Sequence, residues 1–329
     1  MATISEPTCG VFTFVEPDLS VSAHDRPMFA APDTKTAVEE KLVLHDFRTA
    51  TDIARGAEGL DVQGFTFIHH KSALDTELLL NGTNIEVVEE TYAQEALNLA
   101  LEITGAKRGI VHNVVFRRRL SPGEPDLSSL FPKGDTSAPE KAPSRKILVP
   151  SPQGPARQMH IDLSLEGLEQ TLRYCRKDIA EFAAPVLEAQ DRRTAGDKDV
   201  KVPRFAAYSI WRALRTVKRD PIAVCDWRSL DKQSDLVPTE NRKPSEINAC
   251  GYYIGGAMGG LPPKNPQNQR WYWMPNQTPE EVTIIKFADA ASEDPAVAAG
   301  CLHGSPEVPG TEEEETRCSV ETRVYLFWE

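Results

Sequence analysis

The sequence lacks the features that would place the protein in several large classes. Its six cysteines are scattered and none forms a Cys-x-x-Cys pair, which argues against a zinc ribbon and against a disulfide scaffold. No apolar run approaches the roughly eighteen residues of a membrane span. The first twenty residues lack the basic start and apolar core of a secretory signal. We therefore expect a cytoplasmic protein with no membrane partner.

Positive charge is also scarce. The chain has 37 Lys and Arg against 49 Asp and Glu, a formal net charge of −12, so we expect no nucleic-acid partner. The one dense basic run, Phe116–Arg119, is predicted to be either the solvated end of a strand or a patch near the substrate, and the solvated end is favoured. With 329 residues, 40% hydrophobic and 26% charged, the composition is that of a globular protein that can bury a sizeable core.

The composition along the chain indicates one large domain. Residues 1–44 are rich in Pro, Ser, Thr and Asp and are predicted to form an extended N-terminal arm lying over the core. Residues 45–329 are predicted to form a single domain with helical decorations. Within it, Ser121–Ser144 is a long loop rich in Pro, Ser and Gly, and the sequence leaves open whether it is a lid or a disordered insertion.

Hydrophobic periodicity favours a mainly β fold with flanking helices. Val87–Gly105 and Ser164–Arg193 show apolar residues at helical spacing, and each is predicted to be one amphipathic helix. Strand-like runs dominate the second half of the chain, separated by turn signals such as "DP", "PP" and "NPQN". No phosphate-binding glycine motif follows a strand, and the glycine-rich Gly255–Pro263 is predicted to be a flexible loop.

One short stretch, "RQMHIDLS", could supply two ligands of a metal site. Its polarity alternates, so a strand would place His160 and Asp162 on the same face. The pair alone is weak evidence, because roughly 0.4 His-x-Asp pairs are expected by chance in a chain of this composition. A third ligand is needed.

The last thirty residues provide it. His303 lies in "GCLHGSP", and the strand-like "TRCSVETRVYLFWE" that follows places Arg317 and Ser319 on one face. Two histidines and a carboxylate, here His160, Asp162 and His303, are the facial ligand set of non-haem iron(II), with open positions for a bidentate co-substrate and for O2. An arginine fork with a serine hydroxyl suits the far carboxylate of a dicarboxylate such as 2-oxoglutarate.

At these residues the sequence resembles a family of fungal and bacterial iron(II)- and 2-oxoglutarate-dependent oxygenases. The family includes gibberellin-desaturase-like, aspergillic-acid-type hydroxylase/desaturase and cephamycin-hydroxylase-like proteins. The resemblance runs from about residue 60 to the C-terminus. The stretches that carry it are "GFTFIHH", "ITGAKR", "RQMHIDLS", "YSIWRAL", "DPIAVCDWRSL", "QRWYWMPNQTPEEVTIIKFADA" and "RCSVETRVYLFW".

The resemblance implies a double-stranded β-helix core, the jelly roll of cupin-like proteins, that tailors a small-molecule secondary metabolite. It carries His160, Asp162 and His303 over as metal ligands, and Arg317 with Ser319 as the co-substrate clamp. Candidate pocket residues are Arg204, Tyr208, Trp211 and Arg212, with a structural salt bridge as the alternative for Arg212 and a place in the core as the alternative for Trp211. The chain departs from the family's Asn-x-Trp-Arg-Pro block, since it has Ser209 and Ala213 at the outer positions.

Three functional hypotheses follow. The first is an iron(II)- and 2-oxoglutarate-dependent hydroxylase, desaturase or oxidative cyclase. The second keeps the fold without redox chemistry, as a binding or cyclase-like helper protein of a biosynthetic pathway, and metal content would distinguish it from the first. The third is a zinc hydrolase with the same three ligands, which would give Arg317 and Ser319 no role. Substrate identity, the choice between hydroxylation and desaturation, and the oligomeric state are not encoded in any motif.

Overall fold

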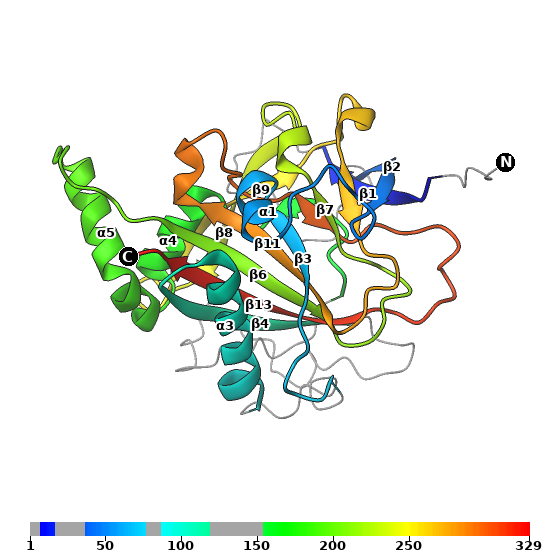
Figure 1. Ribbon diagram of the computed structural model, residues 1–329. Coiled ribbons are helices and arrows are strands. Elements are labelled where there is room, and N and C mark those ends of the chain that lie inside the picture. The colour runs from blue at the N-terminus through cyan, green and yellow to red at the C-terminus, as the bar shows by residue number, and fades with distance from the viewer. Residues whose placement is uncertain (1–6, 17–36, 77–86, 119–153) are drawn as a thin grey trace.

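The protein is described here from a computed structural model that covers residues 7–16, 37–76, 87–118 and 154–329. This part of the chain is built on two antiparallel-rich β-sheets, of five and eight strands, that curl around a shared interior with helices outside (Figure 1). The expected mainly β fold with flanking helices is confirmed. The long loop predicted at 121–144 falls outside the described residues.

The five-stranded sheet has the order β3-β11-β6-β13-β4, and every neighbouring pair is antiparallel. Its strands are β3 (Phe65–His69), β4 (Arg108–Arg118), β6 (Phe205–Ala213), β11 (Glu281–Asp289) and β13 (Cys318–Phe327). Alternate residues of each strand face opposite sides. One side packs into the interior around Trp211, Ile285 and Phe287, and the other side packs Ile210, Ile284 and Val324 against helix α3.

The eight-stranded sheet has the order β1-β2-β10-β7-β12-β5-β9-β8. Its strands are β1 (Cys9–Val15), β2 (Ala37–Asp46), β5 (His160–Ile161), β7 (Ala223–Cys225), β8 (Leu236–Pro244), β9 (Tyr252–Gly260), β10 (Trp271–Trp273) and β12 (His303–Gly304). β1 and β2 pair with each other, and β2 pairs with β10. The boundary expected at residue 44 between arm and domain therefore lies inside β2.

The helices lie outside the two sheets. They are α1 (Gly56–Val62), α3 (Ala93–Thr104) with a π-helical turn (Val87–Tyr92) before it, α4 (Leu165–Tyr174) and α5 (Lys177–Thr194). Short 3-10 turns occupy Trp227–Ser229, Pro266–Asn268 and Ala290–Glu293. Figure 1 shows α3 over one face of the five-stranded sheet and α4 and α5 at one end of it. None of the helices in the described ranges is long and apolar enough to span a membrane.

Two local expectations were wrong. The single helix predicted over Ser164–Arg193 is two helices. Arg176 adopts an extended backbone between them, and its guanidinium binds the carbonyls of Val111 and His112 on β4. The predicted loop at Gly255–Pro263 is instead mostly strand β9. Pairing with β8 along its length and with β5 at its end fixes its glycines in extended backbone.

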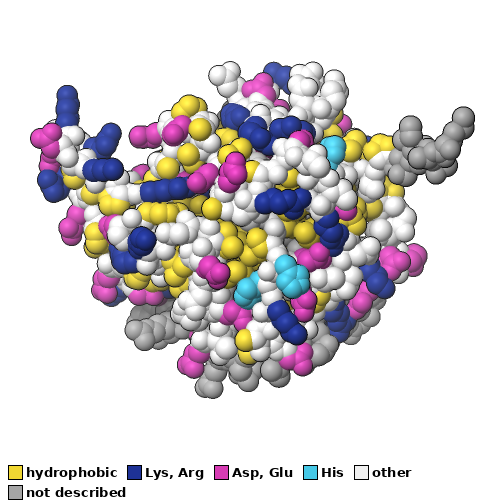
Figure 2. Space-filling view, in the orientation of Figure 1, with side chains coloured by type: hydrophobic (Ala, Val, Ile, Leu, Met, Phe, Trp, Pro, Cys, Tyr) yellow, Lys and Arg dark blue, Asp and Glu magenta, His cyan; other side chains and the backbone are white. Residues whose placement is uncertain are grey.

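Charged side chains of both signs cover the molecular surface. Figure 2 shows lysines and arginines interleaved with aspartates and glutamates on the face that carries α3 and α5. Arg117, in the basic run expected to lie in solvent, is instead buried. It donates from Nε to the Glu321 carboxylate at 2.9 Å, so the outward-facing prediction fails for this residue.

Candidate functional site

Two very short strands bring the three predicted metal ligands together. β5 and β12 pair so that His160 lies directly opposite His303, with 4.5 Å between their ring centroids. Asp162 follows β5 and faces the same side, as the alternation of "MHIDL" predicts. One ligand atom from each of the three residues lies within 4.8 Å of the others, and all three side chains are buried.

Both imidazole rings are oriented so that Nε2 faces the carboxylate of Asp162. Nδ1 of His160 lies 2.7 Å from the carbonyl oxygen of Gln158, and Nδ1 of His303 lies 2.9 Å from that of Cys301. A carbonyl can only accept, so each Nδ1 carries the proton and each Nε2 keeps its lone pair. The Nε2 atoms lie 3.8 and 3.4 Å from the same Asp162 oxygen. Metal-binding histidines are typically oriented by such a backbone acceptor.

The electrostatics keep the ligands in the forms that bind a cation. Burial, together with the neighbouring His303, lowers the pKa of His160 to about 4, so the ring is neutral near pH 7. Burial alone would raise the pKa of Asp162, but the charge of Arg323 and the contacts of the two histidines hold it well below its usual range. Arg323 donates from Nη2 to the other Asp162 oxygen at 3.1 Å.

The predicted clamp residues lie at the start of β13, with Arg317 immediately before the strand and Ser319 on its interior face. Arg317 donates from Nη1 to the carbonyl of Asp220 at 2.8 Å and to the hydroxyl of Ser305 at 3.2 Å. Its guanidinium carbon lies 5.4 Å from the ring centroid of Trp211. Ser319 faces the same side of the strand and is fully buried.

The clamp has unused hydrogen-bonding capacity that fits an anion. Among the described residues, Nε of Arg317 and the hydroxyl of Ser319 have no hydrogen-bond partner, and Arg317 forms no ion pair. Burial, with the positive charge of Arg117 nearby, lowers the pKa of Arg317 to about 10, so the cation is disfavoured where it lies. Buried arginines normally pair with a carboxylate. A carboxylate at this position would satisfy both side chains, as the predicted role requires.

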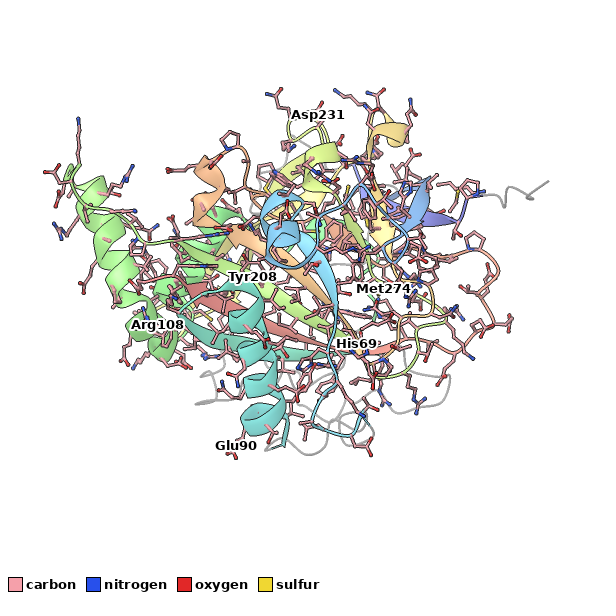
Figure 3. The ribbon with its side chains drawn as sticks, in the orientation of Figure 1. His69, Glu90, Arg108, Tyr208, Asp231 and Met274 are labelled. Carbon is pink, nitrogen blue, oxygen red and sulfur yellow. The ribbon has the colours of Figure 1, made fainter. Side chains whose placement is uncertain are left out.

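Of the four candidate pocket residues, only Trp211 faces the site. Tyr208 and Arg212 differ from it by an odd number of positions on β6, so the alternation of the strand turns them to the outer face. Tyr208, labelled on β6 in Figure 3, packs there in one cluster with residues of α3, and Arg212 donates to the carbonyls of His70 and Pro279, both at 2.8 Å. The structure therefore does not bring these two residues to the metal ligands.

Arg204, the fourth candidate, also lies away from the three ligands. It precedes β6 and forms an ion pair with Asp289 at 2.6 Å and another with Asp61. With helix residues such as Glu169 and Arg193, it lines a separate surface cavity of about 490 Å³ that includes none of the three ligands. These ion pairs connect the start of β6 to neighbouring elements, so the contacts of Arg204 are structural.

Sequence reasoning missed the residues that support the ligands. Arg323 lies on the same face of β13 as Ser319, but no motif marks it as the partner of Asp162. Phe287 of β11 stacks on His303, with ring centroids 5.7 Å apart and planes at 12°. The alternation of β11 could have predicted that Phe287 faces the interior. Its contact with His303 could not be predicted, because that depends on how the strands are arranged in the fold.

Two histidines and one carboxylate, inside a curled β-core and with their metal-binding atoms converging, define the class of non-haem iron oxygenases. Comparison with solved structures agrees with this fold. The chain superposes on the iron and alpha-ketoglutarate-dependent endoperoxidase NvfI with a TM-score of 0.66, over 98% of this chain and 99% of that one, at 21% identity. The jelly-roll expectation is confirmed.

Comparison of sequences identifies the family. Residues 14–327 match the family described as "Oxidoreductase/YMDC permease-like domain". The chain is 31% identical over 301 residues to the gibberellin cluster GA4 desaturase of Gibberella fujikuroi, covering 82% of each chain. It is 28% identical over 339 residues to oxidoreductase chry3 of Gibberella zeae, covering 87% of this chain and 89% of that one. The chain belongs to the fungal iron- and 2-oxoglutarate-dependent hydroxylase/desaturase family.

Proposed function

We propose that the protein oxidises an unactivated C–H bond of a small-molecule secondary metabolite, using iron(II), 2-oxoglutarate and O2. The observation that carries the proposal is the convergence of two Nε2 atoms, each fixed by a bond from Nδ1 to a carbonyl, on one buried carboxylate. In this proposal Nε2 of His160, Nε2 of His303 and the carboxylate of Asp162 hold the iron. Arg317 and Ser319 bind the far carboxylate of 2-oxoglutarate.

The bound iron would supply oxidation by O2 coupled to decarboxylation of 2-oxoglutarate to succinate. The residues of the chain fix where that chemistry occurs. The backbone carbonyls of Gln158 and Cys301 hold the imidazole rings in one tautomer and orientation. Arg323 keeps Asp162 ionised and limits its rotation. Phe287 and Trp211 present apolar surface beside the site, which helps to exclude water.

The nature of the substrate is inferred from the relatives. The printed names of related proteins include a gibberellin cluster GA4 desaturase and hydroxylase/desaturase CTB9 of Cercospora beticola. These names support a small-molecule substrate for this chain and a reaction that is hydroxylation or desaturation. A cytoplasmic location, expected from the sequence, stays a prediction.

Turnover of 2-oxoglutarate tests the proposal without knowledge of the substrate. We expect the iron-loaded wild-type protein to form succinate slowly on its own, and Asp162→Ala to form none above background, because the iron loses its anionic ligand. The matched control is His69→Ala. His69 lies at the exposed end of β3 (Figure 3) and should turn over like the wild type. Wild-type succinate formation in Asp162→Ala, His160→Ala and His303→Ala would contradict the proposal.

A further inference from the structure

The glycine-rich strand β9 forms one wall of the interior next to the metal ligands. Gly259 lies directly opposite His160 in the β5–β9 pair, so the two residues share a face. Alternation places Ala257, Gly255 and Tyr253 on that same face, and all of these positions are buried. At the three successive inward positions Gly255, Ala257 and Gly259, β9 itself carries no side chain larger than a methyl group.

Within β8 and β9, Lys243 is the charged residue on this face. Lys243 of β8 pairs with Tyr253 and shares its inward face. A Cβ placed on Gly255 would lie 3.0 Å from both Cδ and Cε of Lys243 and 3.3 Å from its Nζ. The lysine stem therefore folds over Gly255, from its own position towards the end of β9 that meets His160.

No described residue supplies a counter-ion to the ammonium group of Lys243. Among the described residues it forms no ion pair and no hydrogen bond, and the residue is only partly exposed. Burial lowers its pKa, the Asp162 charge raises it and the Arg323 charge lowers it. Asp162 is already engaged by Arg323 and the two histidines. A positive charge enclosed in this way is unfavourable unless an anion joins it.

Other unused polar groups lie on the same wall. Among the described side chains, Nδ2 of Asn241 and the hydroxyl of Thr239 are buried without a hydrogen-bond partner. Both are on β8, two and four positions before Lys243, and therefore on its face of the strand. Together the three residues offer one cation, one amide donor and one hydroxyl donor beside the glycine and alanine positions of β9.

We propose that Lys243 binds a carboxylate of the small-molecule substrate, with Asn241 and Thr239 as neighbouring donors. The inference rests on the proposed function, since it assigns the substrate that the metal site would oxidise. Gly255 and Gly259 are four positions apart on the same face of β9, and the charge of Asp162 acts on Lys243. The substrate class is thus an organic acid whose carboxylate lies on this wall beside the metal ligands.

The experiment compares an acid with its uncharged isostere. The probes are 1-adamantanecarboxylate and 1-adamantanecarboxamide, titrated calorimetrically into the metal-free protein in excess succinate, which occupies the Arg317 clamp. The variants are Lys243→Met, which keeps the stem and removes the charge, and Lys243→Arg, which keeps the charge. Gly255→Ala displaces the stem without changing any charge. Lys218→Met, at an exposed lysine, is the control.

We expect the wild type and Lys218→Met to bind the acid about 10- to 100-fold more tightly than the amide, the effect of one charge-assisted hydrogen bond. Lys243→Met should lose this preference, Lys243→Arg should keep most of it, and Gly255→Ala should weaken it. An equal affinity for both probes in the wild type, no binding of either probe, or an undiminished preference in Lys243→Met would overturn the proposal. Because the titration contains no iron, a failure of the metal site would show separately, as lost succinate formation in the wild type.

Discussion

Asp162 is the residue on which the site depends, and Arg323 determines its state. The carboxylate faces two imidazoles on one oxygen and the Arg323 guanidinium on the other. Arg323 is in turn paired with Glu321 at 3.4 Å, and Glu321 with Arg117 at 2.9 Å. Arg117, Glu321 and Asp162 are buried and Arg323 is only partly exposed, so solvent screens this chain of alternating charges little. Its effect on Asp162 is to fix both its charge and its orientation.

Removing Arg323 should therefore weaken metal binding. We expect Arg323→Met to bind iron(II) about 10- to 100-fold more weakly than the wild type, the usual cost of losing a partner that orients a metal ligand. Anaerobic competition with a chromophoric chelator measures this affinity. Arg323→Lys should recover part of the iron(II) affinity, since lysine restores the positive charge but not the planar guanidinium. Arg192→Met, at an exposed arginine paired with Asp197, should change nothing. Unaltered affinity in Arg323→Met would remove its positioning role.

The sequence predicted those parts of the candidate site whose residues all lie in one strand-like stretch. His160 with Asp162, and Arg317 with Ser319, are pairs within a strand, and a period of two places each pair on one face. The same rule excludes Tyr208 and Arg212 from the face of Trp211, so that error was avoidable. Lys243 was not predictable. Its role depends on β9 as its neighbour, and the pairing of two strands is a property of the fold.

At the scale of elements, the contact between α4 and β9 positions Asp162. β5 ends after two residues, and the chain continues as the first turn of α4 along the edge of β9. Ser164 caps α4 by accepting a hydrogen bond from the Gly167 amide at 3.0 Å, and its own amide donates to the carbonyl of Gly256 at 3.1 Å. A Cβ on Gly167 would lie only 1.8 Å from that carbonyl oxygen.

Filling this contact should destabilise the protein. Alanine favours a helix more than glycine does, so Gly167→Ala would be stabilising in an open helix. Here we expect it to lower the free energy of unfolding by about 1–3 kcal/mol, because α4 must move away from β9. Urea unfolding measures the change. Gly154→Ala is the matched control, since nothing lies within 4 Å of the added carbon. A Gly167→Ala protein as stable as the control would show that α4 is free to shift.

The sequence predicted a helix or strand correctly where the hydrophobic periodicity of that segment itself determines its structure. The helix expected at Val87–Gly105 is observed as a π-helical turn followed by α3, ending at Gly105 in the left-handed conformation. β9 was missed because its glycines carry no β preference, and their extended backbone is imposed by β8 and β5. The break between α4 and α5 was missed because Arg176 is held by carbonyls of a distant strand.

At the scale of the whole molecule, closing two sheets around one interior buries titratable groups that the unfolded chain exposes. His112 of β4 is an example. Its Nδ1 lies 2.6 Å from the Tyr325 hydroxyl, and their rings stack 5.2 Å apart. Burial, then the positive charges of Arg323, Arg176 and Lys243, lowers its pKa well below the usual value. His112 is therefore neutral in the folded protein at pH values where the unfolded chain protonates it.

This difference makes global stability depend on pH. The unfolded chain binds an extra proton below its histidine pKa of about 6.5, so the contribution is fully present above that pH and is lost as the pH falls. We expect the free energy of unfolding to drop by up to about 1.4 kcal/mol per pH unit below 6.5 from this group. Urea unfolding across that range should show a shallower pH dependence for His112→Asn than for the wild type. His69→Asn, at an exposed histidine, should keep the wild-type slope. Equal slopes in all three proteins would contradict the assignment.

The measurement that tests the central claim most directly is an anaerobic titration of the metal-free protein with iron(II) and then with 2-oxoglutarate. The observable is the weak visible charge-transfer band of the chelated pair, compared between the wild type and Arg317→Ala. We predict a band that appears in the wild type and requires much more 2-oxoglutarate in the variant, because the clamp loses its cation. A wild-type protein that binds no iron(II), or a band unaffected by Arg317→Ala, would contradict the account.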